Sequence, residues 1–210
     1  MPQDNREDIS LDFAFISLIA EKINVIIIGG GKAGYIKAKS FLQKGYNVAV
    51  VSKEFDERFE SRDKGIVLIE DEYKEKYILD KHLVIIATDD NDINRKIRND
   101  CEKHFKVYLN SCNFKDGQFI TPVEIKGNNI KVGIHTRVAS PKTSKFLAEK
   151  IKETTDEYDD FVGFIGSLRS RILQETENRD LNLEIMNFVN SDDFYYFYKK
   201  DVHELILKLF

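Results

Sequence analysis

A glycine-rich turn between two short apolar runs constrains the fold of this chain more than any other feature. The run Val25–Ile28 leads into Gly29-x-Gly31-x-x-Gly34, a helical pattern follows, and a second apolar run begins at Val48. This order is typical of the first half of a dinucleotide-binding βαβ unit, with a purely structural glycine turn as the alternative. In the nucleotide-binding interpretation, Gly29 permits the tight turn, Gly31 admits a pyrophosphate, and Gly34 lets helix and strand pack closely.

The other expected cofactor contacts lie at the start of the helix and at the end of the second strand. A pyrophosphate would lie on the free N–H groups of the first helical turn, at Lys32 and Ala33. NAD enzymes often place an acidic residue at the end of the second strand for the adenosine ribose, and this chain has Ser52-Lys53-Glu54 there. Glu54 comes one or two residues late, and Lys53 could receive a 2′-phosphate. The sequence therefore leaves NAD and NADP open.

Further apolar runs extend this pattern through the first half of the chain. They are Ile66–Ile69, Leu83–Ala87 and Val107–Leu109, with a helical pattern over Asp92–His104. Continuous apolar runs alternating with helices predict a parallel sheet that is buried on both faces. We therefore expect an α/β fold with a Rossmann-type doubly wound parallel sheet. The third run should be a buried strand, and the apolar segment Phe13–Ala20 should pack on the sheet edge.

The pattern then changes to a hairpin. Gln118–Ile125 and Asn129–His135 predict two antiparallel strands. A doubly wound sheet does not need such a hairpin. Because two appended strands require a partner face, we expect this region to form a homodimer.

Helical sequence follows the hairpin. A helix should begin at Ser140-Pro141 and end near Lys152. The acidic stretch Glu153–Asp160 is expected to be a loop, and a helical pattern continues from Phe161 to the end. These patterns divide the chain into a nucleotide-binding domain with an N-terminal extension, a hairpin–helix dimerisation region and a helical C-terminal region, at residues 1–115, 116–154 and 155–210.

Polar residues follow the fourth and fifth strands, at the edge of a parallel sheet where ligands bind. Thr88 and Asp89 are candidates for contact with the cofactor, while Asp90 could simply cap the next helix. Cys112 follows the fifth strand and is a candidate reactive group, with an inert buried thiol as the alternative. The four histidines form no metal-ligand motif, and His135 is of interest because it ends the hairpin.

Composition limits the class of protein and its partners. The chain has 42% hydrophobic and 32% charged residues, as ordinary globular domains do, and its net charge of −4 gives no reason to expect nucleic acid. The two cysteines make no disulfide framework, which favours the reducing cytoplasm. The acidic N-terminus does not resemble a signal peptide, and the segment Phe13–Ala20 is too short to span a membrane.

Several motifs, taken in order, resemble the precorrin-2 dehydrogenase family, which comprises stand-alone enzymes and the N-terminal modules of siroheme synthases. Gly29-Gly30-Gly31-Lys32-Ala33-Gly34 with Lys37 resembles the family's Gly-Gly-Gly-x-Val-Ala-x-x-Lys, and Ala87-Thr88-Asp89-Asp90 with Asn94 resembles its Ala-Thr-Asp-Asp-x-x-x-Asn. Phe119-Ile120-Thr121-Pro122 resembles Phe-Ile-x-Pro, and Ile134–Pro141 resembles Ile-Ser-Thr-Gly-Gly-x-Ser-Pro. The resemblance covers roughly Phe13 to Lys152.

The resemblance implies a fold, a reaction and a set of partners. The family binds NAD on a Rossmann domain, forms an intertwined homodimer through the hairpin region, and completes its substrate cleft with C-terminal helices. It oxidises precorrin-2 to sirohydrochlorin with formation of NADH, and some members also insert ferrous iron or cobalt. For this chain it implies a tetrapyrrole substrate contacted by His135, Thr136, Arg137 and Ser140.

The chain departs from the family at the catalytic residue. The family carries its acid–base aspartate in Asn-x-x-Asp after the fifth strand, and an alignment without gaps places Cys112 at that aspartate. A thiol acts as a base near neutral pH only if its pKa is lowered, and Asp116 could take the role after a loop shift. Cys112 is thus the candidate catalytic residue of an NAD-dependent dehydrogenase. The alternatives are a non-catalytic NAD- or tetrapyrrole-binding protein and a chelatase that has lost oxidation.

Overall fold

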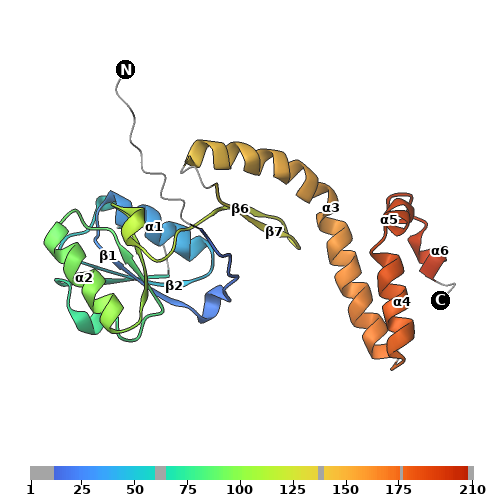
Figure 1. The fold of residues 1–210 in the computed structure, drawn as a ribbon, viewed down its shortest axis with the longest axis horizontal. Helices are drawn as coiled ribbons and strands as arrows, with labels where there is room; N and C mark the ends of the chain where they lie inside the picture. The colour runs from blue at the N-terminus through green and yellow to red at the C-terminus, as the bar shows by residue number, and fades with distance from the viewer. Residues whose placement is uncertain (1–11, 60–64, 137–139, 176, 208–210) are drawn as a thin grey trace, which may run out of the picture. The chain divides into compact units, whose positions relative to one another are not determined.

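The computed structural model describes residues 12–59, 65–136, 140–175 and 177–207 of the chain. The chain forms two compact units, residues 13–121 and a second unit that begins at residue 122 (Figure 1). The first unit contains the glycine-rich turn, and the second contains the hairpin and the long C-terminal helices. Within the described ranges, no helix combines the length and the apolar character needed to cross a membrane.

The first unit is built on a five-stranded parallel sheet with the order β3-β2-β1-β4-β5. Its strands are β1 (Asn24–Ile28), β2 (Asn47–Ser52), β3 (Ile66–Glu70), β4 (Leu83–Ile86) and β5 (Val107–Asn110). Helix α1 (Lys32–Gln43) connects β1 to β2, and α2 (Asn91–Lys103) connects β4 to β5. The predicted α/β Rossmann-type sheet is confirmed. The strand order reverses between β1 and β4, which is where ligands bind in such sheets.

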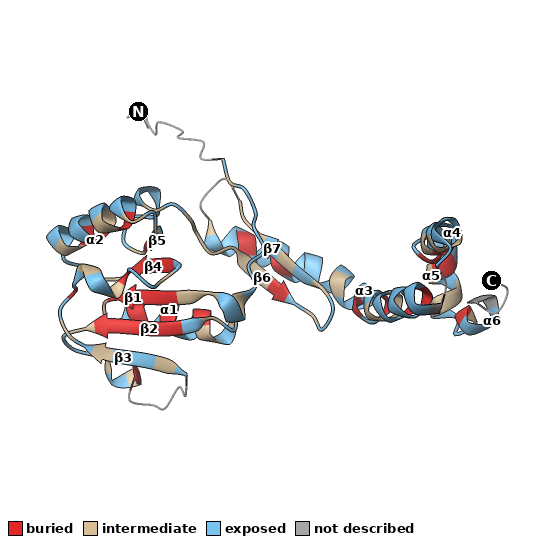
Figure 2. Cartoon of the chain, turned by 90° about the horizontal axis from the view of Figure 1, so that it is seen from below, coloured by how far each residue is buried: buried red, intermediate tan, exposed pale blue. Residues whose placement is uncertain are grey.

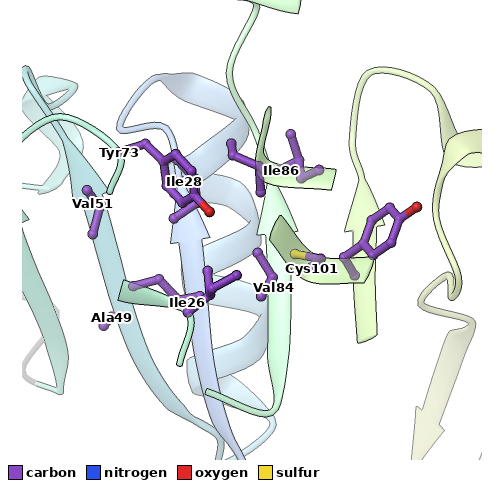
Figure 3. Close-up of a cluster of buried hydrophobic side chains, with 11 residues drawn as sticks. Ile26, Ile28, Ala49, Val51, Tyr73, Val84, Ile86 and Cys101 are labelled. Carbon is purple, nitrogen blue, oxygen red and sulfur yellow. The ribbon is translucent and has the colours of Figure 1, made fainter. Parts of the chain in front are cut away.

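Alternate side chains of the central strand β1 enter two separate cores on the two faces of the sheet. Ile26 lies in the cluster that contains Cys101 of α2 (Figure 3). Ile27 lies in the opposite cluster, which contains Phe41 of α1. Both isoleucines are fully buried, and each such side chain stabilises the fold by about 1.5–3 kcal/mol. The two cores fix the two helices on opposite faces of the sheet.

The third strand is an edge strand, and the expectation that it would be buried is wrong. Val67 is 61% exposed and Leu68 is 43% exposed, whereas β1, β2 and β4 are buried almost throughout (Figure 2). Among the strands that the structure describes, β3 pairs only with β2, so it lies at the edge of the sheet. An apolar run alone does not distinguish an edge strand from an inner one.

The apolar segment before β1 is largely exposed, so the expectation that it packs on the sheet edge is also wrong. Phe15 is 66% and Ile16 is 82% exposed. The 3₁₀ turn Ala20–Lys22 contacts the sheet, where the Glu21 carbonyl accepts a 2.8 Å hydrogen bond from Asn47 Nδ2. Asn47 begins β2, an inner strand, so the chain reaches the sheet where the strands start and not along its edge.

The second unit joins the predicted antiparallel hairpin to a set of helices. Strands β6 (Val123–Lys126) and β7 (Lys131–Ile134) form the hairpin. The helices are α3 (Pro141–Glu175), α4 (Arg179–Val189), α5 (Asp192–Lys199) and α6 (His203–Leu207). A third apolar core holds α3, α4 and α5 together, and its buried members are Phe161, Leu168, Ile172, Ile185, Val189 and Phe194.

Helix α3 continues without a break through Glu153–Asp160, so the predicted loop there is wrong. Two acidic side chains of this stretch have partners from elsewhere in the unit. Glu157 pairs with Lys199 of α5 at 2.8 Å, and Asp159 accepts hydrogen bonds from the backbone of the hairpin turn. Because these partners are distant in sequence, the local charge pattern does not reveal them.

Candidate functional site

The glycine-rich turn is confined by the ends of the neighbouring strands. Gly29 has a φ of +119°, a conformation that residues with side chains rarely adopt. Its N–H donates a 2.9 Å hydrogen bond to the Val51 carbonyl, and a Cβ at Gly29 would lie 2.7 Å from the Ala87 carbonyl carbon. The turn therefore passes between the ends of β2 and β4 with no room for a side chain.

Two other glycines of the turn permit close backbone contacts. A Cβ on Gly34 would overlap the carbonyl oxygen of Gly29, so α1 can begin this close to the turn only without a side chain. A Cβ on Gly30 would lie 2.7 Å from Ser52 Cβ and would overlap the Glu54 carbonyl oxygen. Gly30 has no role in the Gly-x-Gly-x-x-Gly motif, although a run of three glycines indicates that each of them is needed.

Gly31 differs from its neighbours because its surroundings are open. Apart from its two chain neighbours, no described residue has a heavy atom within 4 Å of a Cβ built there. Gly31 is the N-cap of α1, supplies no side-chain cap, and accepts the first intrahelical bond from the Tyr35 N–H at 2.9 Å. The N–H groups of Lys32 and Ala33 consequently have no acceptor within the helix. The first turn also lacks acidic residues. An exposed, positive helix start beside open space fits a pyrophosphate.

Lys53, just after the end of β2, is paired with a carboxylate that follows β3. Lys53 Nζ lies 2.7 Å from Glu72 Oε1. This hydrogen bond is the main cause that raises the pKa of Lys53, and Asp90 adds to the effect. Ser52, the last residue of β2, is half-buried, and Glu54 is exposed. The structure thus brings Ser52, Lys53 and Glu54 to the glycine-rich turn, with the charge of Lys53 balanced by a carboxylate.

A second ion pair in this loop is not anticipated from the sequence. Arg58 binds Asp56 through two hydrogen bonds of 2.6 Å, and this contact is the main cause that lowers the pKa of Asp56 to about 2. The Asp56 N–H donates to the Gly30 carbonyl at 2.8 Å, which ties the pair to the glycine-rich turn. The Arg58 guanidinium also lies over the Tyr35 ring, 5.5 Å from its centroid.

At the end of β4, hydrogen bonds hold Thr88 in place. Asn94 Nδ2 donates to the Thr88 carbonyl at 3.0 Å, and the Thr88 hydroxyl lies 3.2 Å from Asn94 Oδ1. Asp90 caps α2 by accepting the N–H groups two and three residues later, as the capping alternative proposed. Asp89 is exposed. Asn94 is buried, and only the motif match, not the strand pattern, draws attention to it.

The thiol after β5 lies beside the end of β4. Cys112 Sγ donates to the Thr88 carbonyl at 3.2 Å, so these two predicted site residues are in contact. The Asn110 side chain shapes the loop by accepting the N–H groups of Cys112 and Asn113 at 2.9 and 3.3 Å. Cys112 is exposed, so the alternative of an inert buried thiol does not apply to it; Cys101 is the buried cysteine.

A carboxylate is held in the same loop. Asp116 ends the 3₁₀ turn Phe114–Asp116, and its Oδ2 accepts a 3.0 Å hydrogen bond from Asn113 Nδ2. Asn113 also caps this turn by accepting the N–H of Lys115. Asp116 is exposed. The loop after β5 therefore presents both a thiol and an oriented carboxylate.

The candidate substrate residues belong to the second unit. His135 is half-buried, and the hydroxyls of Thr136 and Ser144 lie 3.2 Å apart. Ser140 lies just before α3 and accepts a 3.3 Å hydrogen bond from the Thr143 N–H. Arg137 lies outside the described residues.

Comparison with known families identifies the segment that holds the turn. Residues 16–123 match the model of a family described as "Putative NAD(P)-binding". This segment contains the glycine-rich turn and the ends of β2, β4 and β5. The family description therefore agrees with the fit of the helix start to a pyrophosphate.

Curated relatives and one solved structure extend the comparison. The siroheme synthase of Enterobacter sp. (strain 638) is 27% identical over 151 residues, which cover 70% of this chain and 33% of that protein. The precorrin-2 dehydrogenase of Priestia megaterium is 24% identical over 174 residues, which cover 81% and 86% respectively. A structure named "SirC, precorrin-2 dehydrogenase" shares the fold, with a TM-score of 0.72, 20% identity and coverage of 93% of this chain and 100% of that one. The chain spans about a third of the length of the siroheme synthase it matches.

The surroundings of Gly34 and Gly31 predict that alanine at these two positions changes the stability of the first unit to different extents. Gly34→Ala should destabilise the first unit by more than about 3 kcal/mol, because the backbone oxygen that it meets cannot move aside. Gly31→Ala should cost less than about 1 kcal/mol, the usual penalty of alanine at an N-cap, because the space around it is open. Urea unfolding of both variants measures the difference, and equal losses would contradict the geometry.

Proposed function

Since the chain belongs to the NAD(P)-binding family whose model it matches over residues 16–123, we propose that it is an NAD-dependent dehydrogenase that oxidises precorrin-2 to sirohydrochlorin. The observation that carries the proposal is the open space at Gly31 beside the uncapped start of α1. Relatives named siroheme synthase and precorrin-2 dehydrogenase support the choice of reaction and of a tetrapyrrole substrate.

The residues of the first unit would divide the binding of the cofactor among them. The N–H groups of Lys32 and Ala33 would hold the pyrophosphate, and the loop that starts at Ser52 would hold the adenosine ribose. Thr88, fixed by Asn94, would contact the nicotinamide side, with Asp89 next to it. When bound, NAD supplies the acceptor for the hydride that precorrin-2 loses.

The ion pairs near the end of β2 support NAD over NADP. A 2′-phosphate needs a cation that is free to bind it. Lys53 is paired with Glu72, and Arg58 is held by both oxygens of Asp56. A 2′-phosphate would therefore compete with carboxylates and be repelled by them, whereas ribose hydroxyls can donate hydrogen bonds to the same groups.

The loop after β5 offers two candidates for the acid–base group. Cys112 occupies the position of the family aspartate, and its thiol donates a hydrogen bond to the Thr88 carbonyl. Asp116 is a carboxylate oriented by Asn113. We assign proton transfer to Asp116 and a structural hydrogen bond to Cys112, in place of the catalytic role first proposed for the thiol.

A second function is favoured by the missing aspartate. The chain could bind NAD or a tetrapyrrole without catalysing oxidation, because a thiol stands where the family has its catalytic carboxylate, and the two groups differ in acid–base chemistry. Insertion of ferrous iron or cobalt, which some members of the family catalyse, stays a prediction that the structure does not test. The reducing cytoplasm remains the expected compartment, since both cysteines are free.

The second unit supports a homodimer. The first turns of α3 expose large apolar side chains, with Phe146 58%, Leu147 37% and Ile151 37% exposed. A second copy of the chain would cover this apolar surface, which we name the α3 patch. The lysines at the start of α3, Lys142 and Lys145, are exposed and suit a substrate rich in carboxylates.

The proposed function predicts NAD binding and NADH formation. Calorimetry should show NAD binding more tightly than NADP, and mixing with precorrin-2 and NAD should raise the absorbance of NADH. Gly31→Asp should fold but lose at least about a hundredfold in NAD affinity, because it places a negative charge in the phosphate space. Ile36→Asp adds the same charge on the exposed side of α1 and should bind NAD normally. Bound NAD with no NADH would favour the non-catalytic alternative, and no binding of either nucleotide would reject the proposal.

The acid–base assignment predicts opposite effects at two neighbouring positions. Asp116→Asn should lower turnover by about a hundredfold or more, the usual cost of losing general acid–base catalysis. Cys112→Ser should stay close to wild type, because a hydroxyl can donate the same hydrogen bond to Thr88. Turnover measured across pH distinguishes the two. An inactive serine variant, with an active Asp116→Asn protein, would show that Cys112 is the catalytic group.

The homodimer predicts a concentration-dependent association through the α3 patch. Phe146→Asp should weaken dimerisation by at least about tenfold, since burying a phenylalanine contributes about 1.5–3 kcal/mol. Lys152→Gln changes an exposed residue on another side of the same helix and should leave association unchanged. Analytical ultracentrifugation checks both, and a monomeric wild type at micromolar concentration would reject the dimer.

A further inference from the structure

One carboxylate of α3 binds the whole turn of the hairpin. Asp159 accepts hydrogen bonds from three consecutive backbone N–H groups, those of Asn128 at 2.9 Å, Asn129 at 2.9 Å and Ile130 at 2.8 Å. The Asp159 side chain is buried. Hydrogen bonds to an ionised carboxylate are about twice as strong as bonds between neutral groups. A single strong acceptor on α3 therefore holds the turn of the hairpin.

The fit around this carboxylate depends on two glycines. A Cβ on Gly127 would lie 2.8 Å from the Cγ of Asp159, and a Cβ on Gly163 would lie 2.7 Å from Asn129 Nδ2. Asn129 Nδ2 in turn donates to the Asp159 carbonyl at 3.0 Å. Both the turn and the helix lack a side chain where they approach each other. The contact between the hairpin turn and α3 is therefore part of the close packing of the second unit.

The other end of the hairpin is also attached to α3. After β7 the hydroxyl of Thr136 lies 3.2 Å from that of Ser144, a buried residue of α3. The Ser144 hydroxyl also donates to the Ser140 carbonyl at 3.3 Å. The hairpin is thus fixed to α3 at its turn, through Asp159, and at its base, through Ser144. The segment that carries His135, Thr136 and Ser140 belongs to the base.

We propose that Asp159 is a positioning residue for substrate binding: by fixing the hairpin turn on α3, it fixes the hairpin base from which the candidate substrate residues project. This role rests on the proposed function, because it assumes that the hairpin base contacts precorrin-2. A two-stranded hairpin cannot keep its register alone. Removing one of its two attachments lets the strands tilt on α3, and a displacement of about 1 Å at a binding group can cost about a hundredfold in rate.

Two variants disturb the contact in different ways, and a third serves as control. Asp159→Asn keeps the shape but places an amide NH₂ against a backbone N–H. Gly127→Ala keeps the charge but forces the turn away from the carboxylate. Asp160→Asn removes the same charge from the next, exposed residue of α3 and leaves the turn untouched. If Asp159→Asn fails to fold, Gly127→Ala still tests the role.

Hydrogen exchange and steady-state kinetics together test the proposal. In Asp159→Asn and Gly127→Ala, the amides of residues 128–130 should exchange at least about tenfold faster, and KM for precorrin-2 should rise while the calorimetric Kd for NAD stays unchanged. The control should match wild type in all three. Unchanged exchange, or faster exchange with an unchanged KM for precorrin-2, would overturn the positioning role. A wild type that oxidises no precorrin-2 would instead reject the proposed function, while the exchange data would still decide whether Asp159 holds the turn.

Discussion

The candidate site depends on the close contact between Gly34 of α1 and the carbonyl of Gly29. This contact leaves no room for a side chain on Gly34. This contact lets α1 begin at the carboxyl edge of the sheet, so its first N–H groups face the open space at Gly31. No acidic side chain in the first turn opposes their positive potential. The anion binding that we propose at this position would therefore arise from the backbone, and the surrounding side chains would only refine it.

Hydrogen bonds around the turn hold the side chains in fixed positions. Arg58 and Asp56 form a bidentate pair tied to the Gly30 carbonyl, and Thr88 is held by Asn94. Fixed polar groups lose little entropy when a ligand binds, which favours affinity and specificity. Lys53 and Arg58 are both paired with carboxylates, and the proposed preference for NAD rests on these pairs. The sequence gives the identity of these residues but not their partners.

The sequence predicts the features that depend on local pattern and misses those that depend on distant partners. The βαβ unit and the hairpin follow from glycine spacing and apolar runs, and both are present. The stretch Glu153–Asp160 is helical, but its many charges are typical of a solvent-exposed loop. In the structure, Asp159 is buried against the hairpin turn, about thirty residues earlier in the chain. Likewise, an apolar run does not show that Val67 lies on an edge strand. The sequence identifies Cys112 as a candidate from its position after β5, whereas its contact with Thr88 is seen only in the structure.

The central claim is that the backbone at the start of α1 binds the pyrophosphate of a nicotinamide dinucleotide. The most direct measurement is an NMR titration of the ¹⁵N-labelled chain with NAD, following the backbone amides. The account predicts that the largest shift changes fall on Gly31, Lys32 and Ala33, with smaller ones at Thr88. Shift changes confined to the hairpin or to helices α4–α6, with the amides of Gly31–Ala33 unmoved, would contradict it.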